Sequence, residues 1–588
     1  MQLRIKECSD LRQDLDGGWI VHSKSQGVNM TESKELLSHL HVADIYRGLL
    51  TDLVVEWKFR TWVDILVVVD TEIATVPGVE FGIGSVIQLI RSTSVGCMIF
   101  RVDIALRNEE PPTVAASPGE FEPRYRGFRF DMQAGGQPVI DKYEQIWCFG
   151  FKPSNSGSAS DAEIDLPSSF PASNAELAKL AQWMNDRKGG LFGTGDHHFL
   201  GASMCRNIPR LGSMRRWTNA DRVPPIGTPD RIDTLRPPSP AFEPGAPGGP
   251  LDLSNSPHQG DGTPQPIQWV TWQRTPWPIA WKKRPHPVLC HPKLGPINVM
   301  PDHAHEGLCI ETVDIDPAAT FDFDGSGAKP EYPNAVGGGT KPMPAIIAYG
   351  STLGDPPYNF LKGPQPARSS FPMISVYDGH LAGVGRVATD STWHHWMDVN
   401  IADLKAADGN DWKKISRYYI NLAVWLNPPG LKTHCLWYTT LISHFDYPGF
   451  EEYWPERPVI ELGDVLRRHL YKIYGPCWVT ERIWWELIWV RKLFPWEILR
   501  ERDRLFDFGG IDPELIENLF LGNLVKATFD TADAIKKAAN SGSKKVELKT
   551  TIPDEYFERE LESSIKDVLE RFEAHYSQTL DLLRSARK

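Results

Sequence analysis

The chain has 588 residues, of which 41% are hydrophobic and 23% charged, so its composition is that of a globular protein rather than a disordered or fibrous one. Its 63 basic and 75 acidic residues give a formal net charge of −12, which disfavours a protein that binds nucleic acid through the phosphates. No apolar run reaches the roughly 18 residues of a membrane-spanning helix, so we expect no membrane partner.

The eight cysteines are dispersed along the chain without a CxxC pair, and the first residues lack the apolar stretch of a secretory signal. We therefore expect a cytoplasmic protein whose thiols are reduced and mostly buried. The 21 tryptophans require a large core, an aromatic-lined site or a packing interface, because each brings a large apolar area.

The first change of pattern comes after a polar N-terminal extension at residues 1–60. Residues 62–70, WVDILVVVD, are a nearly continuous apolar run, which is typical of a strand buried on both faces of a parallel sheet. The elements that follow are a helix at 81–91, strands at 97–106 and 143–150, a helix at 175–187 capped by Asn174, and a strand at 191–193. This alternation predicts an α/β fold, with an open parallel sheet flanked by helices.

Two stretches rich in proline and glycine interrupt this domain, which we place at residues 61–430. The longer stretch, at about 207–280, is interpreted as an insertion that lies over the domain. Its small basic patch, Arg215 and Arg216 with Arg210 and Arg222, is interpreted as a solvated loop rather than a phosphate site. Strand patterns resume at 297–300, 308–313, 344–351, 373–378 and 384–389, and a helix is predicted at 411–425.

Residues 431–588 are predicted to be a helical, aromatic C-terminal region. Apolar residues three and four apart run from Phe557 to Leu583, so one apolar stripe follows the helix. This stripe either packs on the chain's own body or contacts a helix of another chain, through self-association or a protein partner.

Histidines and acids gather in three clusters: GTGDHHFLG at 193–201, PDHAHEG at 301–307 and DSTWHHW at 390–396. The first and third directly follow predicted strands, where ligands bind in open α/β sheets. We therefore expect the clusters to converge in one polar pocket, although each histidine pair could instead cap an element or satisfy the core.

Imidazole and carboxylate groups suit either a general acid–base pair or a divalent zinc, manganese or iron ion with an open position for water. The spacing matches neither HExxH nor CxxC, so the metal is a weaker expectation than the pocket. The candidate residues are Asp196, His198, His394, His395 and Glu306 for catalysis, Gly193, Gly195, His197, Trp393 and Trp396 for ligand binding, and Asp302, His303 and His305 for the metal.

The segments GGLFGTGDHHFLG and GRVATDSTWHH resemble the class I glutamine amidotransferase-like superfamily, and within it the ThuA-like (trehalose utilisation) branch. The resemblance covers about residues 60–400 and implies a flavodoxin-like sheet, with a strand-end histidine facing the elbow after a buried strand. Glutaminases of this superfamily need a cysteine at the elbow, but Thr194, Gly195 and Asp196 stand there, so glutamine hydrolysis is not expected. ThuA-like relatives also lack that cysteine and are associated with sugar metabolism, which implies a small polar ligand.

Two functions are consistent with these features. The first is a ThuA-like hydrolase or lyase for a small, carbohydrate-like molecule, in which a histidine or a metal-bound water is the base and a carboxylate orients it. The alternative is a non-catalytic ligand-sensing or scaffold subunit of a bacterial multi-protein assembly, which the missing cysteine, the insertions and the helical C-terminal region also fit.

Overall fold

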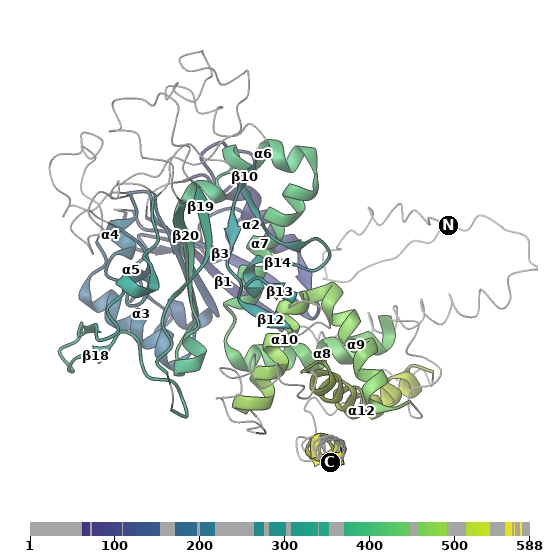
Figure 1. Ribbon diagram of the computed structural model, residues 1–588. Coiled ribbons are helices and arrows are strands. Elements are labelled where there is room, and N and C mark those ends of the chain that lie inside the picture. Colours follow the sequence, from purple (N-terminus) through teal and green to yellow (C-terminus); the bar gives the residue numbers. More distant parts are fainter. Residues whose placement is uncertain are drawn as a thin grey trace, which may run out of the picture.

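The computed structural model describes most of the predicted α/β domain and much of the C-terminal region (Figure 1). The described residues are 61–70, 73–108, 110–152, 171–196, 200–217, 264–275, 282–301, 307–338, 340–351, 370–446, 457–490, 493, 513–540, 559–566, 570 and 577–578. The predicted extension at 1–60 and most of the insertion at about 207–280 lie outside them.

A mixed sheet with a parallel centre forms the body of the protein, so the predicted α/β class is confirmed. Five parallel strands lie side by side in the order β3 (Met98–Leu106), β1 (Thr61–Val69), β8 (Gln145–Phe149), β9 (Gly190–Thr194) and β21 (Val387–Asp390). Counted among these five strands alone, they are the second, first, third, fourth and fifth in chain order; the two-residue strand Tyr125–Arg126 also pairs parallel with β3. The order therefore reverses between β1 and β8, which makes the carboxyl edge there a topological switch point.

Short or antiparallel strands extend both edges of the parallel centre. Beyond β21 lie β20 (Ser370–Tyr377), β19 (Ala345–Ser351) and β11 (Gln268–Trp269), and beyond β3 lie β5 (Tyr125–Arg126), β4 (Thr113–Val114) and β2 (Ser94–Val95). Separate two-stranded ribbons are β6 (Gln133–Ala134) with β7 (Gln137–Pro138), β10 (Pro264–Pro266) with β16 (Val299–Pro301), β12 (Gln273–Thr275) with β13 (Lys282–Arg284), β14 (Cys290–His291) with β15 (Gly295–Pro296), and β17 (Thr320–Phe321) with β18 (Lys329–Pro330). The strand predicted at 297–300 is thus part of a ribbon outside the main sheet, and the one predicted at 308–313 makes only an isolated bridge between Cys309 and Arg215.

Strand β1 shows why the apolar run folds as it does. Its odd-numbered valines and isoleucine, such as Val63, Ile65 and Val67, join one hydrophobic cluster, whereas Leu66 and Val68 join a second cluster on the other face. Successive side chains of a strand point to opposite faces, so a strand covered on both sides must be apolar at nearly every position.

Helices cover both faces of the sheet (Figure 1). They are α2 (Gly84–Ser92), α3 (Asn174–Asp186), α4 (Ala202–Cys205), α5 (Leu211–Met214), α6 (Asp398–Ala407) and α7 (Asn410–Trp425). The predicted cap of α3 was wrong by one residue, because Ser173 is the N-cap and Asn174 is the first helical residue. The Ser173 hydroxyl accepts from the Glu176 N–H while the Glu176 carboxylate accepts from the Ser173 N–H, a reciprocal arrangement that Asn174 does not make.

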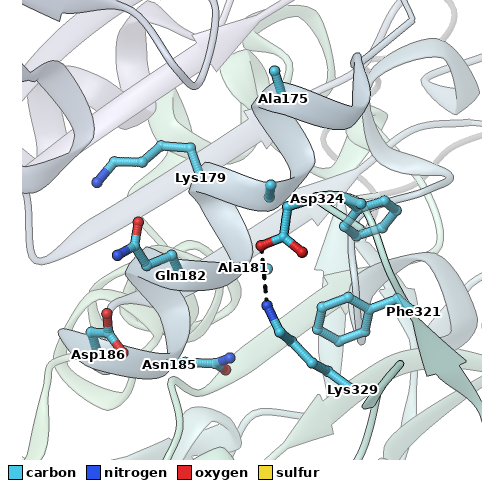
Figure 2. Close-up of a pocket in the computed structure, with 11 residues that line it drawn as sticks. Ala175, Lys179, Ala181, Gln182, Asn185, Asp186, Phe321, Asp324 and Lys329 are labelled. Atoms are coloured by element: carbon cyan, nitrogen blue, oxygen red, sulfur yellow. Dashed lines mark hydrogen bonds and ion pairs between the residues drawn. The ribbon is translucent and has the colours of Figure 1, made fainter. Parts of the chain in front are cut away.

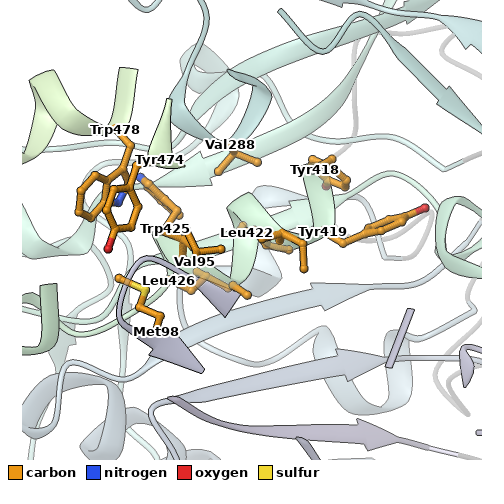
Figure 3. Packing of buried hydrophobic residues seen from close by; sticks show 14 of the residues in the cluster. Val95, Met98, Val288, Tyr418, Tyr419, Leu422, Trp425, Leu426, Tyr474 and Trp478 are labelled. Carbon is orange, nitrogen blue, oxygen red and sulfur yellow. The ribbon is translucent and has the colours of Figure 1, made fainter. Parts of the chain in front are cut away.

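The C-terminal region is helical, as predicted, and packs on the same core as the sheet. It comprises α8 (Pro429–Asp446), α9 (Val459–Tyr474), α10 (Pro476–Trp485), a π-helical turn η10 (Glu486–Val490) and α12 (Pro513–Asn540). Figure 3 shows Tyr474 and Trp478 beside Trp425 of α7, and the first two rings stack with centroids 4.1 Å apart. Among the described helices, none is long and apolar enough to cross a membrane.

Most of the predicted apolar stripe from Phe557 to Leu583 lies outside the described residues. Two of its members are described with their side chains: Leu561 is 0% and Ile565 is 6% exposed, and both join the core cluster of this chain. This part of the stripe therefore packs on the chain's own body, which was one of the two alternatives.

Candidate functional site

The first and third clusters meet at the carboxyl ends of β9 and β21, which are neighbouring parallel strands. Thr194 pairs with Asp390 at the last position of this register. The chain then continues through Gly195 on one strand and into a 3-10 turn, η8 (Trp393–Trp396), on the other. The Trp393 N–H donates to the Gly195 carbonyl at 2.7 Å, so the turn of β21 is held directly over the end of β9.

The glycines of the first cluster allow close packing at this edge. A Cβ atom on Gly193 would collide with Leu211, and one on Gly195 would collide with the Leu200 carbonyl. Gly201 has a φ of +88°, a conformation that favours glycine. Their described contacts therefore give Gly193 and Gly195 a packing role rather than direct contact with a ligand.

The centre of the site is a carboxylate–imidazole pair formed by Asp196 and His394. The His394 Nε2 atom lies 3.3 Å from Asp196 Oδ2, and the two side chains are 5% and 1% exposed. The other oxygen of Asp196 accepts from the Thr392 hydroxyl at 2.8 Å, and that hydroxyl in turn accepts from the His394 N–H at 3.1 Å. The pair is therefore held in a fixed orientation by its own turn.

The other edge and the face of the His394 ring are also in contact with the protein. His394 Nδ1 lies 3.2 Å from Asn400 Oδ1, and the Trp393 ring stacks on the imidazole with centroids 3.7 Å apart. With Asn400 Oδ1 facing Nδ1 and Asp196 Oδ2 facing Nε2, the imidazole donates to both oxygens only when both ring nitrogens are protonated. If the amide is turned, Asn400 donates and a neutral ring donates to Asp196, so either arrangement keeps the contact with Asp196.

Arg215 contacts the ends of both strands. Its guanidinium donates to the carbonyls of Asp196 at 2.6 Å and Ser391 at 2.7 Å, and its cation lies over the Trp217 ring. Arg210 is likewise fully buried, with its amide and side chain bound to Glu331. The interpretation of Arg210 and Arg215 as part of a solvated loop was wrong, because both side chains are buried and donate to groups of the protein.

His395, the next residue, forms a second, fully buried pair with a different aspartate. Its Nδ1 lies 2.8 Å from Asp390 Oδ1, both side chains are 0% exposed, and its Nε2 faces the Gln265 amide at 3.1 Å. The Tyr418 hydroxyl donates to the second oxygen of Asp390, and burial together with this carboxylate raises the pKa of Tyr418 well above its usual value. The enclosure of every polar atom in this group favours an anchoring role over catalysis.

Trp396, a predicted ligand-binding residue, lies in the core. It is 0% exposed and packs against a cage of aromatic rings from β8, β9 and α7. These rings are Trp147, Phe149, Phe192, Tyr418 and Tyr419. Trp393 is 8% exposed and contacts Phe151 with centroids 4.6 Å apart, so it is the tryptophan of this cluster that adjoins the His394 ring.

Asp70, which follows β1 at the topological switch point, was not among the predicted site residues. Its carboxylate accepts from the N–H groups of Phe151 at 2.7 Å and Lys152 at 3.1 Å, and from the Ser203 hydroxyl at 3.4 Å. Burial raises its pKa to about 6, against the lowering effect of those N–H groups. Asp70 thus fixes the turn after β8, whose Phe151 supports Trp393, and the acid that ends the apolar run is the sequence signal for it.

Several predicted site residues lie outside the described part of the chain: His197 and His198 of the first cluster, and Asp302, His303, His305 and Glu306 of the second. The residue that follows the second cluster, Gly307, donates its N–H to the Ser391 carbonyl at 3.1 Å. Within the described ranges, no group of three histidine, cysteine or acidic side chains could hold a metal ion.

The cysteine that follows the first cluster, Cys205, is not placed to act as a nucleophile at this turn. Cys205 lies in α4, is 0% exposed, and burial raises its pKa well above the ordinary value. A protonated, enclosed thiol is a poor nucleophile.

A separate groove of about 570 Å³ lies between α3 and the β17–β18 ribbon (Figure 2). Its lining includes Lys179, Gln182 and Asn185 of α3 and Phe321 and Lys329 of the ribbon. None of the predicted site residues lines it.

Comparison with known proteins found no protein-family model, curated protein or solved structure that matches the chain.

Proposed function

We propose that the chain is a hydrolase or lyase for a small, polar, carbohydrate-like molecule, with Asp196 and His394 as its acid–base pair. The observation that carries the proposal is the 3.3 Å contact between His394 Nε2 and Asp196 Oδ2. These groups are 198 positions apart in the sequence yet end two adjacent parallel strands, at the edge where open α/β sheets bind ligands. The arrangement of the five parallel strands supports a flavodoxin-like sheet, whose order is second, first, third, fourth and fifth.

In this proposal His394 exchanges a proton with the substrate or with an attacking water, and Asp196 orients the ring and stabilises its charged form. Because Nε2 faces Asp196, the exchanging atom is Nδ1. Asn400 Oδ1, 3.2 Å from Nδ1, marks a position that a substrate or water oxygen takes when it replaces the amide. The low exposure of the pair strengthens the electrostatic interaction, since few water molecules screen it.

The family proposal is the ThuA-like branch of the class I glutamine amidotransferase-like superfamily. It is supported by the strand-end position of Asp196 and by the histidine turn that lies over it. Glutaminase activity is not part of the proposal, because Asp196 and its glycines occupy the elbow and Cys205 is enclosed.

We extend the proposal to a divalent zinc, manganese or iron ion held by Asp302, His303 and His305. Imidazole and carboxylate are suitable ligands for these metals, and such an ion would supply an activated water. Gly307, the first described residue after this segment, donates its N–H to the Ser391 carbonyl.

A second candidate is a non-catalytic protein that binds the same kind of ligand and serves as a sensor or scaffold. It is favoured by the enclosure of His394, whose ring is in contact on both edges and on one face. A ligand could then be bound without any proton transfer.

The experiment is to assay the purified protein on disaccharides and p-nitrophenyl glycosides, measuring released reducing sugar or nitrophenol, together with its metal content. We expect turnover that falls about 100-fold or more in His394→Ala and Asp196→Ala, the usual contribution of general acid–base catalysis. His469→Ala, on helix α9, is the matched control and keeps full turnover. If both site variants retain wild-type turnover, the enzyme proposal is wrong; if no substrate is turned over but the sugars raise the unfolding temperature, the sensor candidate replaces it.

A further inference from the structure

The groove between α3 and the β17–β18 ribbon has the dimensions of a ligand site (Figure 2). Its volume of about 570 Å³ lies within the range of about 300–1,000 Å³ that is usual for small-molecule sites. The lining residues of α3 run from Ala175 to Asp186, so the groove follows roughly 16 Å of the helix. The groove can therefore hold an extended ligand.

One wall of the groove is a single face of α3. The residues three and four positions apart on this face are Ala175, Ala178, Gln182 and Asn185. The opposite face of the helix, which includes Leu180 and Met184, is buried in the core. The alanines are short and leave room above the helix, while the two amides supply donors and acceptors of hydrogen bonds.

The other wall carries two aromatic rings, Phe321 and Phe323. The rings stack on one another with centroids 5.3 Å apart and an angle of 23° between their planes. Both side chains are only half-buried, so apolar ring surface remains open to a ligand. The face of an aromatic ring has a negative potential, which attracts the weakly positive C–H groups on the apolar face of a sugar ring.

A buried arginine, Arg210, holds the two walls in place. Its guanidinium donates to Asn185 Oδ1 of α3 at 2.7 Å and to the carbonyl of Glu331, directly after β18, at 2.9 Å. Because a guanidinium only donates, the amide oxygen of Asn185 must face it. The Nδ2 group of Asn185, with its two N–H donors, is therefore the part that a ligand in the groove can reach.

The backbone of Arg210 has a φ of +73°, a conformation that residues other than glycine rarely adopt. Such strain persists where surrounding contacts fix it, and it is common at functional sites. The Arg210 N–H is held by the Glu331 carboxylate at 2.8 Å. The spacing of the walls is thus set before any ligand binds, which lowers the entropic cost of binding.

The charges of the groove cancel, since its lining contains two lysines and two aspartates. Lys329 Nζ lies 3.2 Å from Asp324 Oδ2, and Lys179 Nζ lies 3.3 Å from Asp141 Oδ2. Hydrogen bonds from Ser326, together with Lys329, hold the pKa of Asp324 below its usual value, so this carboxylate stays ionised. Paired charges of this kind favour a neutral ligand over an anionic one.

We propose that this groove is a second binding site, separate from the Asp196–His394 pair, and that it holds a neutral oligosaccharide. The phenylalanine rings pack against the apolar face of a sugar ring, and the amides of Gln182 and Asn185 bond its hydroxyl groups. Binding in the groove does not depend on turnover at the Asp196–His394 pair, because neither residue lines it.

The test is isothermal titration calorimetry of the full chain with maltohexaose, cellohexaose and xylohexaose, followed by chromatography to show that each sugar is intact. Glucose 6-phosphate and hexaglutamate are the anionic probes. We expect one molecule of a neutral hexasaccharide to bind per chain. Phe321→Ala should weaken this binding about tenfold, and Gln182→Ala about threefold or more.

Phe81→Ala is the matched control, since Phe81 is 45% exposed and lies outside the groove, and it should bind as the wild type does. The proposal is overturned if none of the hexasaccharides binds, or if they bind Phe321→Ala and Gln182→Ala as tightly as the wild type. It is also overturned if an anionic probe binds more tightly than the hexasaccharides and this binding is lost in Phe321→Ala. If Phe321→Ala lowers the unfolding temperature, Gln182→Ala decides, because Gln182 is exposed and its loss leaves the core intact.

Discussion

The buried carboxylates of this protein differ in what satisfies them, and this decides their roles. Asp196 faces an imidazole and a hydroxyl at a strand end, whereas Asp390 is enclosed by His395 and Tyr418. Asp70 is held by backbone N–H groups and a serine, with no cation in direct contact among the hydrogen bonds described above. The same residue type therefore serves as a candidate acid–base partner, an anchor and a support for a turn.

Asp70 should give the protein a measurable pH dependence of stability. Its folded pKa of about 6 lies above the ordinary 3.8, so the folded state holds the proton more tightly than the unfolded state. This contribution is fully present below about pH 4 and is lost as the pH rises through about 6, a decrease of about 3 kcal/mol in the free energy of unfolding. In urea titrations at a series of pH values, Asp70→Asn should lack this pH-dependent part of the free energy of unfolding. If the variant loses as much stability between low and neutral pH as the wild type, the prediction is wrong.

The Asp390–His395 pair should matter for stability. Asp390→Ala leaves the imidazole and the Tyr418 hydroxyl without their buried acceptor, so we expect a loss of about 3 kcal/mol or more in denaturant unfolding. Asp403→Ala, at an exposed position of α6, is the control and should change stability by less than about 0.5 kcal/mol. Equal effects of the two substitutions would show that the pair does not anchor the turn.

At the scale of elements, the sequence predicted the strands that are apolar throughout and missed what depends on distant partners. The run at 62–70 could be predicted because burial on both faces requires an apolar residue at nearly every position. The segments at 297–300 and 308–313 have strand-like patterns too, but a pattern does not reveal which neighbour supplies the hydrogen bonds. The direction of β19 and β20 was equally hidden, since a buried strand reads the same in parallel and antiparallel sheets.

The site was predictable to a similar degree. Asp196 and His394 could be predicted as site residues because polar residues that follow buried parallel strands lie together at the carboxyl edge of the sheet. The burial of Arg215 could not be predicted, because its acceptors are backbone carbonyls, which every residue has and which no sequence pattern distinguishes. The choice between His394 and His395 also depends on how the 3-10 turn directs two successive side chains.

The start of helix α3 offers a direct test of an element boundary. Ser173→Ala removes the capping hydroxyl and should lower the free energy of unfolding by about 1 kcal/mol. Asn174→Ala should have a smaller effect, because Asn174 is already helical. A larger loss in Asn174→Ala would mean that the cap lies one residue later, as the sequence alone indicated.

At the scale of the whole molecule, the C-terminal helices and the sheet form one packed body. Besides the shared apolar core, Arg386 near β21 binds Asp378 and also reaches Glu481 of α10 at 2.7 Å. Its cation lies over the Trp425 ring of α7. The Arg386 side chain is 3% exposed, so this charged junction is largely shielded from solvent.

Removing this junction should loosen the C-terminal helices. Arg386→Met leaves two carboxylates without their cation, and we expect a loss of about 3 kcal/mol or more with faster amide hydrogen exchange in α8 and α10. Arg468→Ala is the control, since that side chain is 73% exposed in its ion pair with Asp464. Unchanged exchange in Arg386→Met would show that apolar packing alone holds the two regions together.

The role of Asp196 and His394 as the acid–base pair can be decided by comparing turnover in Asp196→Asn and Asp390→Asn. Both substitutions remove one charge from a buried aspartate that contacts a histidine in the same turn. On the best substrate of the sugar panel, below the unfolding temperature of each variant, we expect about a 100-fold or greater loss of turnover in Asp196→Asn and little loss in Asp390→Asn. Wild-type turnover in Asp196→Asn, or equal losses in the two variants, would contradict it.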